Sequence, residues 1–355
     1  MRYFDETLLA NSRPHQAWWG QVSATRNHFY ERDVGVHNDQ GLHVNAQTIL
    51  PPDFWFDLDE QTVRLMRDDG GEEFMNDLMA LARPVNIGKM VSIARTSSDL
   101  SDKVVRSVSG QVPIDLDKVE YGYDGAPITI FAKGYGRSWR EVLKFQSEGY
   151  DALADDNEAA LDKVDRNMVD YALDGDTDIN IEGFSAYGVR TAPNSKSINL
   201  GNAAGGANID LTDVNLTADD IDNFFIGPFG AMLDANLVSQ PVNLYISPEI
   251  ARNWDRAYSG SAGTKPGTIM NHIERNRRIN KIVVTYKLSG NEFFGFVPSA
   301  RYIRPLVAMA VNTTPRVRLN LTDDHQFLTM GAMGIQIRGD GNGRGGVFYS
   351  VVVNT

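Results

Sequence analysis

The spacing of apolar residues changes several times along the chain, and the first 83 residues already fall into two parts. Residues 1–52 show poor periodicity and scattered aromatic residues, among them Trp18 and Tyr30. They form either a loosely ordered tail or an extended arm that packs on a neighbouring copy, and the cost of exposing aromatic side chains favours the arm. Residues 53–83 carry apolar residues at helical spacing and predict one or two helices, with a break at Gly70–Gly71.

Residues 84–137 predict a long two-stranded arm. Apolar and polar residues alternate from Val85 to Arg95, and the alternation returns from Ile128 to Ala132. The polar stretch between these two segments is too long for an ordinary hairpin turn. Because an isolated hairpin is only marginally stable in water, we expect the arm to need a partner surface.

Two helices are predicted next. Ser138 and Glu141 have the spacing of a capping box that opens a short helix, which Gly149 separates from the following element. A long helix is predicted over 151–174 and ends at Gly175; at about 1.5 Å per residue it spans on the order of 30–35 Å. Its apolar stripe follows helical spacing: Leu153, Leu161, Val164, Met168 and Tyr171.

The middle of the chain mixes loop, helix and strand patterns. Residues 176–216 are rich in Gly, Asn and Ser and predict a loop-rich link. Thr217 caps a further helix, which Pro228 is expected to kink or split. Alternation over 242–246 predicts a strand, and Ser247 then caps another helix.

The last quarter of the chain predicts strands joined by glycine-containing turns. A hairpin is expected over 282–297, turned at Ser289–Asn291. Strands are expected at 307–311 and 316–320, and a final strand pair is joined by the turn at Gly339–Gly343. Helices and strands are thus mixed in an α+β pattern.

Charge and composition narrow the classes of function. The formal net charge is −12, which argues against a generic nucleic-acid binder but is compatible with the wall of a DNA container that must not grip phosphates. The chain has no cysteine and therefore no disulfide or thiolate chemistry. The N-terminus lacks a signal-peptide pattern and no apolar run is long enough for a membrane span, so we expect a cytosolic, unprocessed protein without membrane contact.

An acidic cluster after the long helix imitates a calcium-binding loop. Asp174, Asp176 and Asp178 match the first ligands of an EF-hand. Ile179 stands where that loop needs glycine, and Ser185 stands where it needs a carboxylate. A polar helix exit is the favoured interpretation.

Other chemical motifs also depart from their patterns. The glycine run 339–346 lies between predicted strands and lacks the Lys-Ser/Thr end of a phosphate-binding loop, and the segment beginning at Gly260 misses that loop's spacing. Residues 183–188 are one residue too long for a nucleophile elbow. The histidines do not pair at metal-ligand spacing within a helix: His15, His28, His37, His43, His272 and His325. We therefore predict no catalytic, cofactor-binding or metal-binding residues, and no enzyme.

The order of these elements, with three stretches of sequence, resembles the Hong Kong 97-type major capsid proteins of tailed bacteriophages. The stretches are the helix exit DGDTDINIEGFSAYGVRTAPNS, the strand–helix unit NLYISPEIARNW and the closing segment MGIQIRGDGNGRGGVFYSVV. The resemblance covers nearly the whole chain, although each motif alone is weakly specific. It implies the α+β capsid fold of that family.

The resemblance also implies a division of the chain. The expected parts are an N-terminal arm at 1–52, a helical segment at 53–83, an extended hairpin loop at 84–137, a peripheral domain at 138–216 and 301–355 with its spine helix at 151–174, and an axial domain at 217–300.

In function, the resemblance implies a structural protein that forms the hexamers and pentamers of an icosahedral head. Packaged double-stranded DNA would be contacted weakly and non-specifically. A separate scaffolding protein, a portal and a decoration protein are expected partners, and the protein would reach the virion after assembly in the bacterial cytoplasm. Procapsid maturation by expansion would bend the chain near Gly149 and near Gly134 and Gly136.

Some members of that family crosslink a hairpin lysine to an asparagine of another subunit. The candidates in this sequence are Lys89, Lys103 and Lys118 with Asn312, Asn342 or Asn354. Lysine and asparagine are common on any surface, so an uncrosslinked protein is favoured. The alternatives to a phage head are an encapsulin-type nanocompartment of the same fold and, more remotely, a cytosolic hydrolase.

Overall fold

The computed structural model describes most of the chain after residue 70. The described ranges are 71–100, 117–147, 151–260, 263–320 and 322–354, with two isolated positions at 24 and 108. The chain divides into two compact units, Met1–Leu65 and Met66–Thr355, and the elements below all belong to the second. Apart from position 24, the predicted arm over 1–52 and the predicted helix before Gly70 lie outside the described residues.

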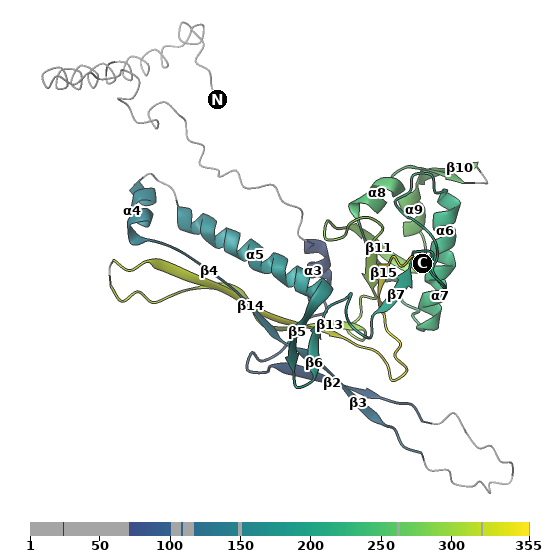
Figure 1. Ribbon diagram of the computed structural model, residues 1–355, viewed down its shortest axis with the longest axis horizontal. Coiled ribbons are helices and arrows are strands. Elements are labelled where there is room, and N and C mark those ends of the chain that lie inside the picture. Colours follow the sequence, from purple (N-terminus) through teal and green to yellow (C-terminus); the bar gives the residue numbers. More distant parts are fainter. Residues whose placement is uncertain are drawn as a thin grey trace, which may run out of the picture. The chain divides into compact units, whose positions relative to one another are not determined.

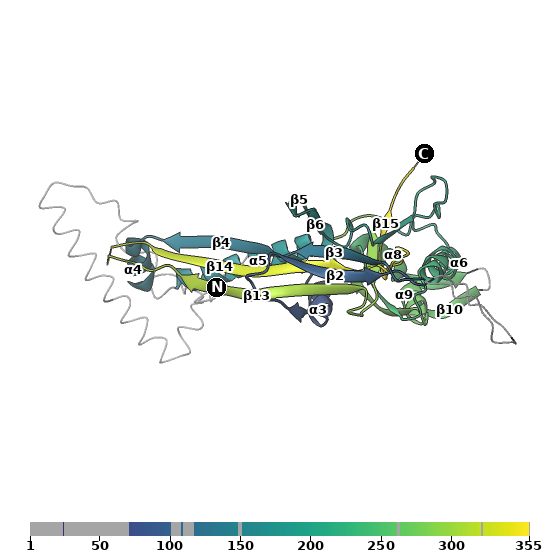
Figure 2. The same ribbon diagram turned by 90° about the horizontal axis from the view of Figure 1, so that it is seen from below.

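A four-stranded sheet forms one layer of the second unit (Figure 1). Its strand order is β1 (Arg83–Pro84), β13 (Ile303–Pro315), β14 (His325–Ile337) and β4 (Thr129–Arg137). The three long strands are antiparallel neighbours, whereas β1 is parallel to β13. Figure 2 shows these long strands side by side along one direction.

Helix α5 (Ala152–Asp174) lies along one face of this long sheet and packs on β4, β13 and β14. Asp151 caps the helix by accepting hydrogen bonds from the backbone N–H groups of Leu153 and Ala154, and Gly175, with a φ of 69°, ends it. Its 23 residues span about 35 Å. The prediction of a long helix over 151–174 is confirmed.

Two shorter helices flank α5. Helix α4 (Trp139–Ser147) begins with the predicted capping box, in which the Glu141 N–H donates to Ser138 Oγ at 3.3 Å and the Ser138 N–H donates to the Glu141 carboxylate at 3.2 Å. Helix α3 (Glu72–Met79) begins after Gly71, whose φ of 83° is readily adopted only by glycine. Helix α3 therefore begins at the predicted break, whereas Gly70 and the residues before it lie outside the described residues.

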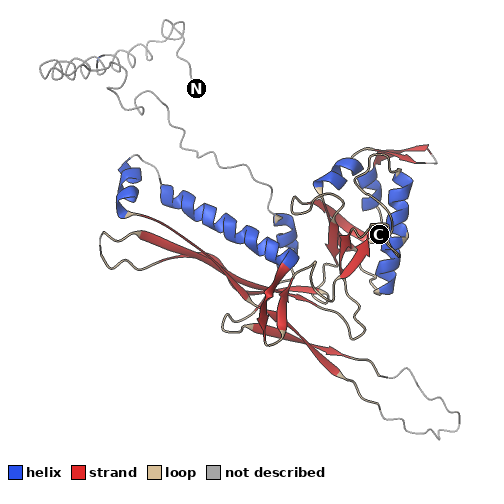
Figure 3. Cartoon of the chain, viewed as in Figure 1, coloured by secondary structure: helices blue, strands red, loops and turns tan. Residues whose placement is uncertain are grey.

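A second sheet has five strands. Their order is β11 (Ile279–Val284), β8 (Val242–Ile246), β12 (Phe293–Phe296), β15 (Val347–Val351) and β7 (Lys196–Asn199). Four helices gather around it in Figure 3: α6 (Ala218–Ile226), α7 (Pro228–Ala235), α8 (Pro248–Trp254) and α9 (Ile269–Glu274). The split at Pro228 and the caps at Thr217 and Ser247 agree with the sequence.

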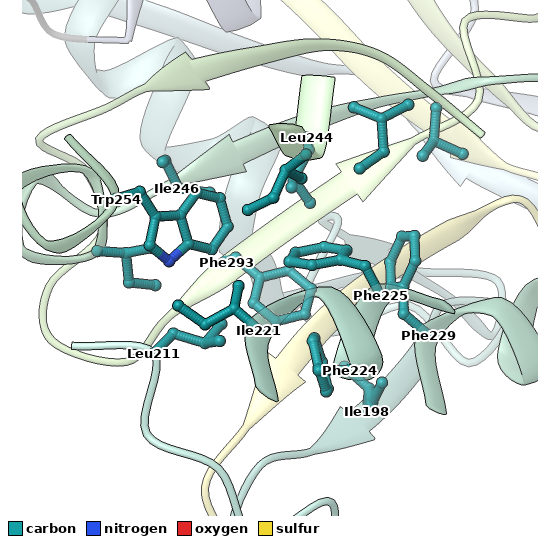
Figure 4. Packing of buried hydrophobic residues seen from close by; sticks show 14 of the residues in the cluster. Ile198, Leu211, Ile221, Phe224, Phe225, Phe229, Leu244, Ile246, Trp254 and Phe293 are labelled. Carbon is teal, nitrogen blue, oxygen red and sulfur yellow. The ribbon is translucent and has the colours of Figure 1, made fainter. Parts of the chain in front are cut away.

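Aromatic side chains fill the space between this sheet and its helices (Figure 4). Phe225 packs edge-on against both Phe229 and Trp254, with ring centroids 5.4 and 5.5 Å apart. Phe229 also meets Phe348 of β15 at 5.2 Å, so a strand from the C-terminal end belongs to this core. Edge-to-face packing of this kind adds stability beyond the buried area.

Three two-stranded hairpins complete the described fold. They are β2 (Val91–Ser97) with β3 (Tyr121–Pro127), β5 (Gly175–Ile181) with β6 (Phe184–Tyr187), and β9 (Ala257–Gly260) with β10 (Gly263–Thr268). Residues 176–216 therefore contain strands where only a loop-rich link was predicted. The turn between β5 and β6 uses positive φ at Glu182 and Gly183, a geometry that suits a tight hairpin.

The hairpin predicted over 282–297 is wrong. β11 and β12 do not pair with each other, because β8 lies between them and pairs with both. All four residues of β12 are buried, so this strand is a central one with a neighbour on each edge. Chain proximity favoured the local pairing, but burial on both sides requires the longer-range one.

The predicted strand at 316–320 and the predicted final strand pair are also wrong. Residues 316–320 belong to the connection between β13 and β14. β14 and β15 lie in different sheets, and residues 338–346 carry the chain from the long sheet to the five-stranded one. Glycine turn chemistry is shared by hairpins and by crossings of this kind, so the sequence could not separate them.

The arm predicted over 84–137 contains a strand pair with different bounds. The alternating segment from Ile128 to Ala132 enters β4 and pairs with β14 of the long sheet. β2 pairs instead with β3, which comes directly before Ile128 in a segment where no strand was predicted. Residues 85–90 form no strand. None of the helices in the described part of the chain combines the length with the apolar character needed to cross a membrane.

Candidate interaction surface on the projecting hairpin

The β2–β3 hairpin extends away from the long sheet (Figures 1 and 3). Its two faces differ in the side chains that they carry. Because strand side chains alternate, the cross-strand pairs Ile93–Gly125 and Arg95–Tyr123 share one face. The pair Ala94–Asp124 lies on the other. The two faces differ in burial, and this difference identifies the surface of interest.

The face that carries Ile93 is open to solvent. Ile93, Tyr121 and Tyr123 are 57%, 59% and 63% exposed. The Arg95 guanidinium lies 5.3 Å from the Tyr121 ring centroid and 6.0 Å from that of Tyr123, which holds the two rings along the strand. We call Ile93, Tyr121 and Tyr123 the hairpin patch.

The opposite face packs on the chain's own body near the root of the hairpin. Ala94 and Ala126 are buried. On the hairpin-patch side, Gly125 admits the ring of Phe184 from β6, since a Cβ at this glycine would lie 2.6 Å from the ring. The root is therefore fixed by close contacts, whereas the exposed face beyond it has no covering among the described residues.

Asp124 adds a polar attachment at the root. Its carboxylate accepts a hydrogen bond from Asn194 Nδ2 at 3.1 Å, and the same amide group donates to the Ile337 carbonyl at 3.2 Å. Burial raises the pKa of Asp124, and the Asn194 hydrogen bond and the Arg338 charge oppose that shift. The hairpin is thus tied to β14 and to the loop before β7.

A second exposed apolar group lies in the connection between β13 and β14. Val317 and Leu319 are each 89% exposed. The connection is shaped by Asp323, whose carboxylate accepts hydrogen bonds from the backbone N–H groups of Asn320 and Leu319 at 2.8 and 3.0 Å. These hydrogen bonds lower the pKa of Asp323. Large apolar side chains held outward by an ordered loop are typical of contact surfaces.

The acidic residues after α5 serve structural roles. Asp174 forms a two-pronged pair with Arg190, at 2.6 and 2.7 Å, and Asp176 accepts a hydrogen bond from the Asp178 N–H at 3.2 Å. The Ser185 hydroxyl oxygen accepts a hydrogen bond from Asn180 Nδ2 at 3.1 Å. Within the described ranges, no group of three or more His, Asp or Glu residues is placed to hold a metal ion.

The glycine run 339–346 is explained by close packing. A Cβ at Gly345 would lie 2.3 Å from the Asn194 carbonyl oxygen, and one at Gly346 would lie 2.5 Å from the Tyr302 ring. These glycines let the crossing between the two sheets pass against β7 and β13 connections without a clash. No phosphate-binding geometry is needed to account for them.

The remaining candidate residues are scattered. The rings of His272 and Tyr258 are tilted by 53° with centroids 4.4 Å apart, and His325 Nε2 lies 2.8 Å from Arg318. The other four histidines lie outside the described residues. Lys103 and Gly149 lie there too. Neither Lys89 nor Lys118 forms a side-chain hydrogen bond with a described asparagine.

The expected hinge glycines Gly134 and Gly136 lie inside β4, opposite Leu328 and Gln326 of β14. A Cβ at Gly136 would lie 2.6 Å from the His325 carbonyl oxygen, so close strand packing accounts for this glycine. At Gly134 the nearest such atom is 3.8 Å away, which leaves room for a side chain.

One polar cluster was not predicted from the sequence. Asp77 of α3 accepts hydrogen bonds from the Tyr245 hydroxyl, from Lys281 Nζ at 2.8 Å and from Asn243 Nδ2 at 3.3 Å. It joins α3 to β8 and β11 of the five-stranded sheet. Its members are far apart in sequence and each looks like an ordinary polar residue, so no local pattern could have revealed it.

Comparisons with known proteins identify the family of this chain and solved structures with a similar fold. The chain belongs to a family of unknown function, DUF6260, which it matches over residues 45–350. A search of curated proteins found no match. Among solved structures, the capsid of Myoviridae Phage XM1 is 10% identical with a TM-score of 0.63, and the alignment covers 87% of this chain and 100% of that one.

Two further solved structures have a similar fold. The capsid of a native GTA particle is 11% identical with a TM-score of 0.55, covering 88% of this chain and 100% of that one. A structure from Mycobacterium phage Bobi is 10% identical with a TM-score of 0.52, covering 79% and 91%. The chain therefore has the Hong Kong 97-type α+β capsid fold predicted from the order of its elements.

Proposed function

We propose that this chain is a major capsid protein that assembles with copies of itself into the hexamers and pentamers of an icosahedral phage head around double-stranded DNA. The observation that carries the proposal is the hairpin patch: apolar side chains on a two-stranded projection of a capsid fold that are more than half exposed in the described chain. Such a face gains stability when it is buried against a neighbour.

The two sheets support a division of the chain into a peripheral and an axial domain. The long sheet with α5 corresponds to a peripheral domain, and the five-stranded sheet with α6–α9 to an axial domain. Because β7 and β15 belong to the five-stranded sheet, the axial domain takes residues from about 196 onward and from the closing strand as well as 217–300. We place the extended hairpin loop at 91–127 instead of 84–137, and the pairing of β2 with β3 supports these bounds.

We further propose a structural role without catalysis, in the virion after assembly in the host cytoplasm. The acidic composition, with 46 Asp and Glu against 34 Lys and Arg, supports a wall that contacts DNA weakly. A scaffolding protein, a portal and a decoration protein are proposed partners. Maturation by expansion would move the hairpin and α5 relative to a neighbouring subunit.

The experiment is expression of the full chain followed by sedimentation and negative-stain electron microscopy. The proposal predicts closed shells or ring-shaped capsomers that dissociate in denaturant. Co-expression with a scaffolding protein from the same phage tests whether closure needs that partner. A protein that stays monomeric at high concentration, alone and with scaffold, would contradict the proposal.

A further inference from the structure

A polar cavity of about 300 Å³ opens beside the root of the hairpin. Its lining comes from β2 and Asp124 of the hairpin, from Asn236–Leu237 after α7, from Arg301–Tyr302 before β13, and from the crossing that begins at Arg338. Anything bound there would touch the hairpin and both sheets' connections at once. The cavity is therefore placed to sense or stabilise the position of the hairpin.

Positive charge predominates in the lining of this cavity. Three arginines, Arg301, Arg338 and Arg344, line it together with two carboxylates, Asp124 and Asp340. Arg344 pairs with Asp340 at 3.9 Å, and the guanidinium of Arg95 lies over the Tyr121 and Tyr123 rings instead. This excess is unusual in a chain whose formal net charge is −12. A concentration of arginine in an acidic protein points to an anionic partner.

Among the arginines of the cavity, Arg338 has the fewest partners for its positive charge within the described chain. Its guanidinium forms no hydrogen bond or salt bridge with the described residues, although it is partly buried. Burial lowers the pKa of Arg338, the nearby Arg304 and Arg83 lower it further, and Asp124 opposes them. An additional carboxylate in the cavity would offset this unfavourable environment and use donors that are now free.

The walls of the cavity are already formed. Leu237 has a φ of 53°, a strained value for a branched apolar residue, and its side chain is 67% exposed. Asn236 holds this turn by accepting a hydrogen bond from the Gly345 N–H at 3.2 Å and donating to the Met232 carbonyl at 2.9 Å. A held, strained apolar residue beside arginines suits a protein partner better than a small hydrated anion.

We propose that this cavity binds an Asp or Glu side chain presented by a second copy of the chain, with Arg338 as the principal donor and Leu237 as the adjoining apolar contact. The proposal rests on the proposed function and deepens it by identifying a charged contact beside the hairpin patch. A second copy is an ample source of carboxylates, because acidic residues outnumber basic ones in the chain. Arginine can hold a carboxylate through two parallel hydrogen bonds, which fixes orientation as well as contact.

The test compares Arg338→Ala, Arg338→Glu and Arg338→Lys with wild type, using the full chain. We expect Arg338→Ala to leave the unfolding temperature of dissociated subunits unchanged or higher. We expect it to raise the concentration needed for assembly by about tenfold, with a larger effect for Arg338→Glu. Arg338→Lys should recover part of the loss. Arg252→Ala, at an exposed position of α8, is the matched control and should assemble as wild type does.

A photo-crosslinking amino acid at Leu237 gives an independent result that does not depend on the stability of the arginine variants. In particles mixed from isotopically light and heavy chains, we expect crosslinks between copies, to a peptide that contains Asp or Glu. Crosslinks only within one chain, or normal assembly of both Arg338→Ala and Arg338→Glu, would overturn the proposal.

A sulfate titration of dissociated subunits tells whether the cavity binds a free oxyanion or a carboxylate of a second copy. If sulfate raises the unfolding temperature of wild type but not of Arg338→Ala, while both assemble equally, the cavity holds a free oxyanion and the second-copy assignment is wrong. If wild type forms no assembly under any condition, the proposed function itself fails, which is a different outcome from normal assembly of the variants.

Discussion

At the scale of single residues, crowding at Gly125 determines how the hairpin joins the rest of the chain. The ring of Phe184 lies against the bare backbone of this glycine, and a Cβ would come within 2.6 Å of it. Phe184 is held in β6, so it has little room to withdraw. A side chain at position 125 must therefore push the hairpin away from the β5–β6 pair.

We expect Gly125→Ala to destabilise the subunit by about 1–3 kcal/mol, the usual cost of overpacking. Gly134→Ala in β4 is the control, because the nearest atom to its added Cβ is 3.8 Å away. Urea unfolding of dissociated subunits measures both. Equal stability of the two variants would show that the contact with Phe184 is not a constraint.

Tyr245 and Asp77 form a second residue-scale feature with a pH signature. Burial, and then the hydrogen bond to Asp77, raise the pKa of Tyr245 above its ordinary value of 10.0. The folded state therefore favours the neutral phenol. This contribution to stability is fully present below pH 10 and is lost as the pH rises above that value, where the unfolded chain ionises and the folded one does not.

Tyr245→Phe should cost about 1.5–3 kcal/mol at pH 8, the range for a hydrogen bond to a charged group. The difference between wild type and variant should shrink at pH 11, because only wild type has the Tyr245 phenol to ionise on unfolding. Urea unfolding at the two pH values gives the comparison. A difference that stays constant or grows with pH would contradict the assigned environment of Tyr245.

At the scale of elements, the hairpin joins a fixed root to an exposed apolar face. The root is held by Gly125, by Asp124 and by the buried alanines of its inner face. Ile93 and Tyr123 beyond it contribute little to the stability of a single subunit, since they remain in water. These side chains would contribute to stability only when another surface buries them.

The double variant Ile93→Ser with Tyr123→Ser should therefore separate folding from assembly. Its unfolding free energy as a dissociated subunit should stay within about 0.5 kcal/mol of wild type, as for most exposed positions. Assembly should be lost or strongly weakened, measured by sedimentation. Tyr286→Ser, at an exposed tyrosine after β11, is the control. Normal assembly of the double variant would exclude the hairpin patch as a contact.

Elements with strong local signals could be predicted from the sequence, and strand partners could not. The capping box at Ser138, the stripe of α5 and the Ser247–Pro248 helix start depend on neighbours within a few residues. The partner of β12 depends on β8, about fifty residues earlier, and that of β4 on β14, far later in the chain. Alternation shows that a strand exists but not which edge it meets.

The candidate surface was predictable in part for the same reason. The sequence indicated a strand pair between Pro84 and Arg137 that needs a partner, although it assigned the wrong segments to that pair. The cavity beside Arg338 could not be predicted, because it unites β2, the turn at Leu237 and the crossing after β14. Only the folded chain brings these three together.

At the scale of the whole molecule, the described chain has two well-filled cores and exposed apolar groups outside both. Cores of this size predict that a subunit folds alone. The hairpin patch and the pair Val317–Leu319 have no role within one subunit, and the proposed assembly would account for them by repeated contacts between copies. A contact that joins unlike surfaces of identical subunits can close into rings and shells.

Electron cryomicroscopy of assembled particles, at a resolution that shows side chains, tests this account most directly. The account predicts that strands β2 and β3 lie across a neighbouring subunit, with Ile93, Tyr121 and Tyr123 buried against it. A map in which these three side chains remain in solvent, or fold back onto their own subunit, would contradict the account.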